Sequence, residues 1–529
     1  MIDIAIVGCG PVGATLAGLL GRRGLQVAVF DKSRDIYPMP RAVGFDHDAI
    51  RIFQEIGVAE ALGPHVEPFR EGIYSGADRQ TIQHVRHMPP PYPLTWPPHF
   101  TCDQPGVEAV VRKAIAKMPS VSTHLGWELR SFKDLGESVQ LELTDSEGLP
   151  QTLQARYLVG CDGGASFVRR QLGVGVENLD YDHPWVVVDV KVEPEHLDRL
   201  PSYNVQFCEP ERPSTYICCP GNHRRWEFMT LPGEASEGAV EPERLWRLLS
   251  RWLKPGEATI WRAAAYRFHA LVANPWQVGH VLLAGDSAHM TPPFLGQGMC
   301  QGLRDAGNLA WKLADVLQRR APASLLDTYS AERRPHVTET TRIAKELGRI
   351  ISERDPVRAR QRDAAILAEN GGQPRLLIRQ NLIPELRHGL IAIGEPLAGR
   401  VFPQPRVEVA DQADLLFDDL FGPAWRWVID AQCVDGHDAL ANLARALGLS
   451  IVVVHPPGTA RPHDEPGIRH AVDLSGTMRS YWEAAGVQAA LVRPDHIIYG
   501  AAADPSGAER VLAAFAASPA RHTEHCNRP

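Results

Sequence analysis

The segment Val281-Leu-Leu-Ala-Gly-Asp-Ser-Ala-His-Met-Thr-Pro-Pro-Phe-Leu-Gly-Gln-Gly298 predicts a buried strand, a stiff loop and the start of a long helix. Its first four residues are apolar, as in a short strand that is covered on both faces. Two adjacent prolines stiffen the loop, and glycines flank the point where helical spacing begins. Free N–H groups at a helix start stabilise negative charge on a bound group, and Asp286 can bind a sugar hydroxyl. The segment therefore predicts half of a site for a long polar ligand.

A glycine motif near the N-terminus, Gly8-Cys-Gly-Pro-Val-Gly13, predicts the other half. Gly8 permits a tight turn, Gly10 lets backbone amides approach a pyrophosphate, and Gly13 lets a helix pack on a strand. Asp31 ends the next strand, where an acid can bind ribose hydroxyls. A tight turn without a ligand is the alternative, and the complete strand–helix–strand pattern favours a dinucleotide. The expected elements are a strand at 2–7, a helix at 12–22 and a strand at 27–30.

Together the two motifs predict a bound flavin and redox chemistry. Arg41 is either a second charge on the pyrophosphate or a solvated surface residue, and Gln104 is a similar candidate for ribose or ribityl hydroxyls. Asp162 either approaches the diphosphate or caps the helix that follows it. His289 is expected to support its loop rather than to transfer protons, and Arg304-Asp305 is either a surface pair or a brace for the helix.

Composition excludes several classes of function. The formal net charge of −8 is spread along the 529 residues, which argues against a nucleic-acid partner. The nine cysteines form no Cys-x-x-Cys pair and no zinc spacing, so we expect reduced thiols, no bound metal and a cytoplasmic location. No uncharged run approaches the roughly 20 residues of a membrane helix, and we expect neither a membrane span nor a signal peptide.

The order of predicted elements indicates an α/β chain with about three domains. Six prolines between residues 89 and 98 predict a loop. Turn-separated strand candidates between 184 and 270 predict an antiparallel sheet, and a Pro/Gly-rich passage at 394–408 predicts a linker. Other expectations are a ribbon at 138–145 and 151–159, helices at 106–117, 298–319 and 324–353, and short C-terminal strands at 451–455, 489–493 and 496–499.

Three segments resemble the class A FAD-dependent aromatic monooxygenases, the para-hydroxybenzoate hydroxylase superfamily. They are GCGPVG at 8–13, GCDGGASFVRR at 160–170 and GDSAHMTPPFLGQGMCQGLRDAGNLAWKL at 285–313. The resemblance covers roughly residues 1–350. Segments 182–189, 209–216 and 224–228 are similar to the 3-(3-hydroxyphenyl)propionate hydroxylase branch. The C-terminal part resembles the thioredoxin-like tail of phenol-type hydroxylases, but it lacks Cys-x-x-Cys, so redox activity of its own is not expected.

The resemblance implies a Rossmann-like FAD-binding domain, an inserted antiparallel-sheet substrate domain and a thioredoxin-like C-terminal domain. The implied boundaries are 1–75, 100–180 and 275–395 for the FAD-binding domain, 76–99 and 181–274 for the substrate domain, and 396–529 for the tail. It also implies that NADH or NADPH reduces FAD and that a flavin hydroperoxide formed with O2 hydroxylates a phenolic ring. Ortho-hydroxylation of a 3-hydroxyphenylpropionate-like acid is the expected reaction.

The resemblance assigns FAD-binding residues but no catalytic residue. The FAD-binding candidates are Gly8, Gly10, Pro11, Val12, Gly13, Asp31, Lys32, Arg41, Gln104, Asp162, Gly285, Asp286, Pro293, Gly296, Gln297, Gly298 and Met299. Gln206, Tyr216 and Arg225 are candidates to face the substrate, although strand parity could turn each of them outward. In the best-known member of the superfamily an arginine on the corresponding strand grips a carboxylate. Ser214-Thr-Tyr216 supplies no arginine there, so the anchor for a longer acid is unassigned.

Three other readings remain open. A tailoring hydroxylase of a larger polycyclic phenol would share the motifs. A flavin-dependent halogenase would share the scaffold, and its Trp-x-Trp-x-Ile-Pro signature has a near match at Trp425-Arg-Trp-Val-Ile429, where Asp430 replaces the proline. A flavin-binding partner without catalysis is the third alternative. A homo-oligomer is compatible with the sequence, which does not decide the oligomeric state.

Overall fold

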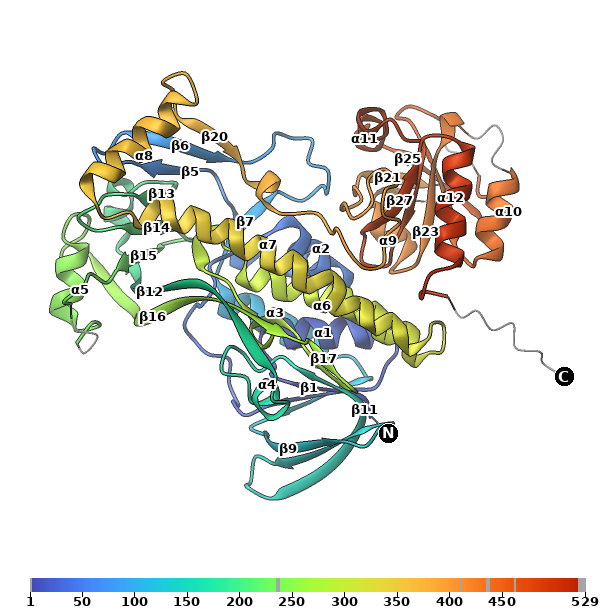
Figure 1. Cartoon of the computed structure of the whole chain (residues 1–529), viewed down its shortest axis with the longest axis horizontal. Helices are drawn as coiled ribbons and strands as arrows, with labels where there is room; N and C mark the ends of the chain where they lie inside the picture. Colours follow the sequence, from blue (N-terminus) through green and yellow to red (C-terminus); the bar gives the residue numbers. More distant parts are fainter. Residues whose placement is uncertain (1, 235–237, 410–411, 434–437, 461–462, 522–529) are drawn as a thin grey trace.

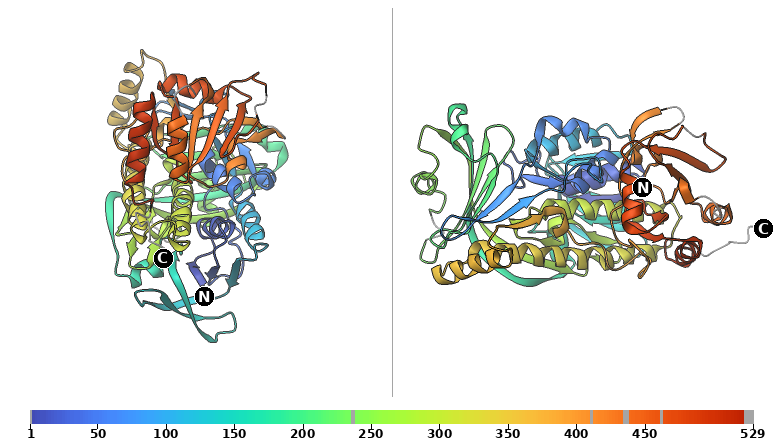
Figure 2. Two further views of the ribbon diagram at one scale, coloured as in Figure 1. Left: turned by 90° about the vertical axis from the view of Figure 1, so that its right-hand side faces the viewer. Right: turned by 90° about the horizontal axis from the view of Figure 1, so that it is seen from above.

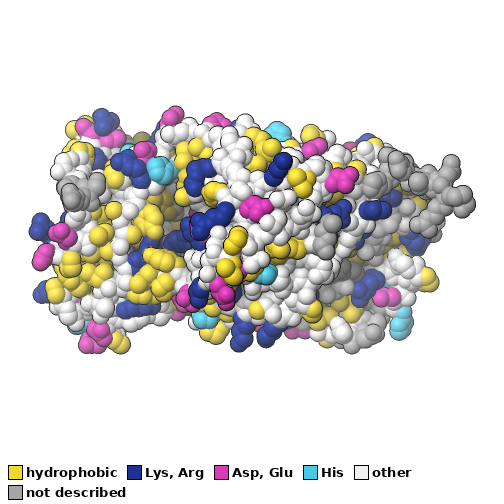
Figure 3. Space-filling model, turned by 90° about the horizontal axis from the view of Figure 1, so that it is seen from below, with side chains coloured by type: hydrophobic (Ala, Val, Ile, Leu, Met, Phe, Trp, Pro, Cys, Tyr) yellow, Lys and Arg dark blue, Asp and Glu magenta, His cyan; other side chains and the backbone are white. Residues whose placement is uncertain are grey.

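The structure is a computed structural model, and it describes residues 2–521 except 235–237, 410–411, 434–437 and 461–462. The described part of the chain forms three large β-sheets, and the long helices α6 (Gly298–Leu317) and α7 (Asp327–Ser352) run across the molecule between them (Figure 1). The second sheet and the C-terminal sheet lie at opposite ends (Figure 2). On the face seen from below, basic, acidic and hydrophobic side chains are interspersed, with a group of Lys and Arg near the middle (Figure 3). The architecture is the predicted α/β class.

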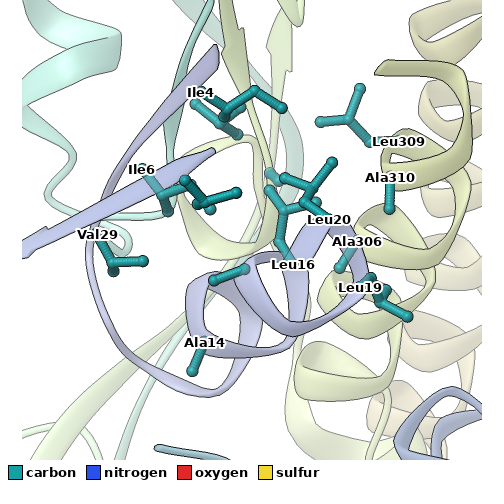
Figure 4. Close-up of a cluster of buried hydrophobic side chains, with 14 of the residues drawn as sticks. Ile4, Ile6, Ala14, Leu16, Leu19, Leu20, Val29, Ala306, Leu309 and Ala310 are labelled. Atoms are coloured by element: carbon teal, nitrogen blue, oxygen red, sulfur yellow. The ribbon is translucent and has the colours of Figure 1, made fainter. Parts of the chain in front are cut away.

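The first sheet contains the predicted nucleotide-binding unit. Strand β1 pairs in parallel with β2 on one side and with β11 on the other, and α1 connects β1 to β2. Apolar residues of β1, β2, α1 and α6 form one core, in which Leu16 and Leu20 point towards Ile4 (Figure 4). The strand order is β17-β18-β11-β1-β2-β8, with β10 and β9 continuing from β11. The bounds are β1 Ile2–Val7, β2 Val27–Asp31, β8 Val121–Leu125, β9 Glu128–Asp134, β10 Val139–Thr144, β11 Pro150–Gly160, β17 Gln277–Val278 and β18 Val281–Leu283.

The second sheet is larger than predicted. Its order is β19-β16-β12-β15-β14-β13-β5-β6-β20. The long strand β16 (Ala258–Asn274) pairs along most of β12 (Gly175–Val192) and was not predicted. Strands β5 (Gly72–Ser75) and β20 (Arg375–Ile378) also belong to this sheet, although the expected boundaries place them in the FAD-binding domain. The other bounds are β6 Thr81–Arg86, β13 Asn204–Phe207, β14 Ser214–Cys218, β15 His223–Met229 and β19 His289–Met290.

Shorter elements connect these layers. A small sheet has the spatial order β3 (Gly44–Asp46), β7 (His99–Cys102) and β4 (Val66–Pro68). The proline-rich stretch between β6 and β7 contains no helix or strand, as predicted. The helices are α1 Pro11–Arg22, α2 His47–Glu55, α3 Gln104–Ile115, α4 Phe167–Gln171, α5 Pro242–Leu249, α8 Pro356–Ala368, α9 Phe417–Phe421, α10 Asp438–Ala446, α11 Thr477–Ala485 and α12 Pro505–Ala516.

The C-terminal sheet has the order β22-β21-β25-β24-β23-β26-β27. Strand β24 is parallel to β23, whereas β26 and β27 form an antiparallel hairpin on its other side. This order is compatible with the thioredoxin-like tail, which stays a prediction. The bounds are β21 Arg406–Val409, β22 Gln412–Leu416, β23 Arg426–Asp430, β24 Ser450–His455, β25 Ile468–Asp473, β26 Ala489–Val492 and β27 Ile498–Ala502.

Candidate functional site

One cavity of about 850 Å³ runs from the glycine turn after β1 to the second sheet. The segment after β18 and the start of α6 form another part of its wall. The structure therefore brings together the two motifs that lie almost 300 residues apart in the chain. The predicted FAD-binding residues that line it are Gly8, Gly10, Pro11, Val12, Asp31, Lys32, Arg41, Gln104, Asp162, Asp286, Pro293, Gly296, Gly298 and Met299.

The glycine turn is shaped by close packing on one side and open space on the other. Gly8 has a φ of +104°, which a side chain would strain, and a Cβ on Gly13 would lie 1.9 Å from the carbonyl oxygen of Gly8. No protein atom lies within 4 Å of a Cβ placed on Gly10. Helix α1 begins at Pro11 without a side-chain cap, so its first N–H groups are free. A pyrophosphate fits at Gly10 and this helix start.

The loop after β18 offers a second set of free groups. Asp286 is exposed to the cavity, and no described residue forms a hydrogen bond or ion pair with its carboxylate. Helix α6 begins at Gly298 without a side-chain cap, and a Cβ on Gly298 would meet no protein atom within 4 Å. An uncapped helix start beside open space suits the negatively charged edge of a reduced flavin.

Three predicted FAD-binding residues lie behind the cavity wall instead of in it. Gly13 and Gly285 are packing positions, since Gly285 has a φ of +65° and a Cβ there would lie 3.0 Å from Val12. Gln297 is fully buried, and its side-chain amide donates a 2.9 Å hydrogen bond to Asp46. The packing of these residues shapes the wall, and their direct contact with FAD stays a prediction.

His289 and Asp305 hold the loop in place. Asp305 accepts hydrogen bonds from the backbone N–H of Gly285 (2.9 Å), from Nε2 of His289 (2.7 Å) and from Nε of Arg333 (2.9 Å). These partners keep the pKa of Asp305 low, at about 2, although burial opposes them. His289 supports the loop, as predicted. Asp305 is fully buried, and the half-buried Arg304 binds Asp46 of β3 and Asp48 of α2 (2.7 Å each), so the surface-pair alternative is wrong and Arg304 braces α6.

Other predicted ligands have partners within the protein. Asp31 accepts hydrogen bonds from the backbone of Cys9 (2.7 Å) and Ser33 (2.8 Å), so it also fixes the glycine turn. Gln104 accepts two from the backbone of Arg41 (2.9 Å) and Ala42 (2.7 Å). The Arg41 guanidinium lies 5.5 Å from the Tyr37 ring centre, and no described carboxylate pairs with it. It remains free for a phosphate.

Asp162 is a helix cap. Its carboxylate accepts hydrogen bonds from the Ser166 hydroxyl and from the backbone N–H groups of Phe167 (2.6 Å) and Val168 (3.0 Å) at the start of α4. The capping alternative therefore explains the partners of this carboxylate, and the residue also lines the cavity.

Strand register decides which substrate candidates face the cavity. Gln206 pairs with Thr215 and both line it, whereas Tyr216 pairs with Val205 on the opposite face. Tyr216 is fully buried in the core beneath the sheet and donates a 2.8 Å hydrogen bond to the carbonyl of Pro201. The prediction for Tyr216 is therefore wrong, and Gln206 lies where it was expected.

Arg225 also lines the cavity, but its N–H groups are already used. They bind Asp189 (2.7 and 3.0 Å) and the carbonyls of Pro40 (2.7 Å) and Arg41 (2.9 Å). Arg225 thus ties the second sheet to the loop that carries Arg41, and it is a poor candidate to grip a substrate carboxylate.

Sequence reasoning missed several charged residues of the wall, among them Glu227 on β15 and Arg379 after β20. Glu227 could have been found, because it alternates with Arg225 on one strand and shares its face. Arg379 follows a strand that pairs with a partner almost 300 residues away, and no local pattern marks it. Apolar residues complete this end of the wall, among them Val187, Ile217, Phe268 and Phe294.

The near match to the halogenase signature has a structural role. The matching segment, residues 425–429, runs into strand β23, and its Trp427 is fully buried in the core of the C-terminal part. No helix among the described residues is long and apolar enough to cross a membrane.

Comparisons with known proteins identify the chain's relatives. The family model "FAD binding domain" matches residues 1–344, and the model "HcaD C-terminal domain" matches residues 399–518. A probable NADH-specific resorcinol 4-hydroxylase of Rhodococcus jostii (strain RHA1) is 34% identical over 98% of this chain and 96% of its own. A 3-(3-hydroxy-phenyl)propionate/3-hydroxycinnamic acid hydroxylase of Mycobacterium avium (strain 104) is 34% identical over 94% of this chain and 89% of its own.

Solved structures share the fold. The flavin-dependent monooxygenase PieE in complex with FAD and substrate has a TM-score of 0.77 at 20% identity, covering 97% of this chain and 98% of its own. Aklavinone-11 hydroxylase with FAD and aklavinone has a TM-score of 0.75 at 22% identity, with the same coverage. With the FAD family model matched over more than half of its length and relatives that span nearly all of it, the chain belongs to the family of FAD-dependent aromatic hydroxylases.

Proposed function

We propose that the protein uses NADH or NADPH and O2 to hydroxylate a phenolic acid ortho to its ring hydroxyl. A 3-hydroxyphenylpropionate-like acid is the proposed type of substrate. The course of the cavity supports this most directly, because it joins the glycine turn to a mixed apolar and polar wall on the second sheet. The names of two relatives point the same way, since resorcinol and 3-(3-hydroxyphenyl)propionate are both phenols with a substituent at the meta position.

FAD supplies electron transfer and oxygen activation when it is bound. In this proposal the turn at Gly10 and the guanidinium of Arg41 hold the pyrophosphate, Asp286 binds a ribityl hydroxyl, and the start of α6 at Gly298 faces the pyrimidine edge. Phe268 and Phe294 would keep water away from the reacting atoms. The domain boundaries remain those expected from sequence, with β5 and β20 added to the substrate domain.

Arg379 supports an acid rather than a neutral phenol. Its guanidinium lines the cavity and donates to the carbonyl of Leu295, in the flavin-facing loop. No carboxylate of the described residues forms an ion pair with it, and burial lowers its pKa. A half-buried cation whose charge no described carboxylate balances favours an anionic ligand, and the guanidinium fork matches a carboxylate. Arg379 would thus provide the anchor that Ser214-Thr-Tyr216 does not.

The test is anaerobic reduction of the bound flavin by NADH and by NADPH across a panel of phenols, followed by product identification in air. The panel should contain 3-(3-hydroxyphenyl)propionate, resorcinol, 3-propylphenol and a polycyclic phenol. The proposal expects the phenolic acid to accelerate reduction and to yield a catechol. Faster turnover of the polycyclic phenol would favour the tailoring alternative. A flavin that no phenol helps to reduce would favour a non-catalytic partner.

Because the electron donor of the proposed reaction is an intracellular metabolite, we also propose a cytoplasmic location. Measuring the size of the purified protein in solution would show whether it forms a homo-oligomer.

A further inference from the structure

Glu227, on the central strand β15, is a buried carboxylate that faces the cavity without a hydrogen-bond donor. Its residue is 5% exposed, and it lines the cavity. The nearest basic group, Nη1 of Arg225, lies 3.9 Å from Oε1, beyond hydrogen-bond distance. Arg225 directs its N–H groups to Asp189 and to two backbone carbonyls instead. Glu227 therefore keeps acceptor oxygens for a donor that the described residues do not supply.

Glu227 lies between the two places where the FAD-binding part touches the second sheet. Residues two apart on a strand share a face and are about 7 Å apart. Glu227 pairs with Val187 on β12. On one side of this pair, two residues along β12 from Val187, Trp185 packs on Phe294 of the loop between β18 and α6, with ring centres 5.5 Å apart. On the other side, Arg225 binds the carbonyl of Arg41. A ring held between flavin and sheet would thus lie beside Glu227.

The energetics of this position also point to a ligand. A buried carboxylate without a donor costs several kcal/mol if it stays ionised. Burial raises the pKa of Glu227, Asp189 on β12 adds to this effect, and Arg225 and Arg262 on β16 oppose it. The Nε of Arg262 is likewise buried without a partner. Apolar and aromatic side chains, among them Val187, Ile217 and Phe268, line the cavity together with these charged groups, so the missing donor fits a hydroxyl on an aromatic ring.

We propose that Glu227 accepts the proton of the substrate's ring hydroxyl, an inference that rests on the proposed function. The O–H bond of the phenol breaks, an O–H bond to Glu227 Oε forms, and the electron pair stays on the phenolate oxygen. The phenolate raises the electron density of the ortho carbon, which is the carbon that receives oxygen. When the ring becomes aromatic again, the C–H bond of the ortho carbon breaks and its proton passes to solvent, while the proton on Glu227 returns to the product oxygen. Glu227 is then a catalytic residue that touches the substrate.

The test compares Glu227→Gln, which keeps the shape but cannot take a proton, with Glu227→Asp and with Glu211→Gln. Glu211 is exposed in the turn between β13 and β14 and controls for the same chemical change. General-base catalysis contributes about 10²- to 10⁴-fold, so Glu227→Gln should lower kcat by at least about 100-fold with its FAD content unchanged. Activity should partly recover in Glu227→Asp, and in Glu227→Gln at alkaline pH or with phenols of low pKa. The Glu211→Gln enzyme should match the wild type.

A readout without turnover separates this role from a structural one. The ultraviolet difference spectrum of the phenolic acid bound to oxidised holoenzyme reports phenolate, and a pH series gives the apparent pKa of the bound hydroxyl. We expect this pKa to be higher on the wild type than on Glu227→Gln, because the ionised carboxylate of Glu227 opposes a second negative charge on the phenolate at high pH, whereas the neutral amide does not. The inference would be overturned if the wild type and Glu227→Gln had the same pKa of the bound hydroxyl and the same kcat, or if the variant differed from the wild type only in KM. If the wild type hydroxylates no phenol, the proposed function itself fails; if it does and the variant matches it, only the role of Glu227 fails.

Discussion

Arg493 donates two hydrogen bonds to the carboxylate of Glu332, over distances of 3.1 and 2.8 Å. Arg493 follows β26 of the C-terminal sheet and Glu332 belongs to α7, so the pair joins the tail to the body of the protein. Arg493 also binds Asp495, and its own side chain is fully buried. Arg493→Met would remove two hydrogen bonds from each of two buried carboxylates, Glu332 and Asp495, and we expect a cost of about 3–5 kcal/mol although Glu332 keeps Lys312. Urea unfolding should show this loss, and a change below about 1 kcal/mol would contradict the role of the pair.

Lys312 should behave in the opposite way. Its Nζ lies 2.8 Å from Glu332, and burial lowers its pKa to about 8. Glu332 keeps Arg493 when Lys312 is replaced, so we expect Lys312→Met to be neutral or stabilising. The pKa of a lysine in an unfolded chain is about 10.4. Between pH 8 and this value Lys312 is protonated in the unfolded chain but not in the folded one. The free energy of unfolding of the wild type therefore rises with pH over this range. Unfolding free energies measured from pH 8 to 10 should show this rise in the wild type and lose it in Lys312→Met.

Gly10→Ala and Gly13→Ala make a matched pair. A Cβ on Gly10 enters open cavity, so the protein should fold but bind FAD at least about tenfold more weakly, because the added methyl group displaces the pyrophosphate. A Cβ on Gly13 would collide with the carbonyl of Gly8, so that variant should lose stability even without FAD. Flavin content after desalting and Tm of the apoproteins distinguish the two outcomes. Equal behaviour of both variants would argue against this division of roles.

Asp286 and Asp162 should also separate binding from stability. Asp286 has no described partner, so Asp286→Ala should weaken FAD binding with little change in apoprotein Tm. Asp162 caps α4, so Asp162→Ala should cost about 1–2 kcal/mol of stability. Titration of apoprotein with FAD and thermal unfolding measure the two effects. A reversed pattern would assign the ligand role to Asp162 instead.

Arg379 should discriminate between acidic and neutral substrates. Losing a charged hydrogen-bond partner costs about 1.5–3 kcal/mol, so Arg379→Met should raise KM for 3-(3-hydroxyphenyl)propionate by about 10- to 100-fold. KM for 3-propylphenol, which lacks the carboxylate, should change little. Arg375→Met is the control, because Arg375 binds Gln83 away from the cavity. Equal losses for both substrates would show that Arg379 supports the loop at Leu295 rather than binding the acid.

Local patterns predicted the parts of the site that short segments build. The glycine spacing from Gly8 to Gly13 and the carboxylate at Asp286 each follow a strand within a few residues, so sequence alone located both. The same holds for α6 and α7, whose apolar spacing is regular. Asp305 was ambiguous, because its partners come from the loop after β18 and from α7, and only the fold brings these two segments to it.

Long-range pairing explains the errors. The face of Tyr216 depends on its register with Val205, and no local signal sets that register. Strand β16 contains Ala263-Ala-Ala265, which favours a helix, but pairing with β12 overrides this preference. Arg379 reaches the cavity because β20 pairs with β6, a contact between distant parts of the chain.

Helix α6 has one end at the cavity and the other beneath the C-terminal sheet. Its Trp311 packs against Trp425, with ring centres 5.6 Å apart, and lies under the guanidinium of Arg493. A fragment cut after α8 would carry every predicted FAD-binding residue, yet it would expose this indole and the charges of Lys312 and Glu332 to water. The family model for FAD binding ends at residue 344, but we expect the smallest stable flavoprotein unit to extend through the last strands of the chain.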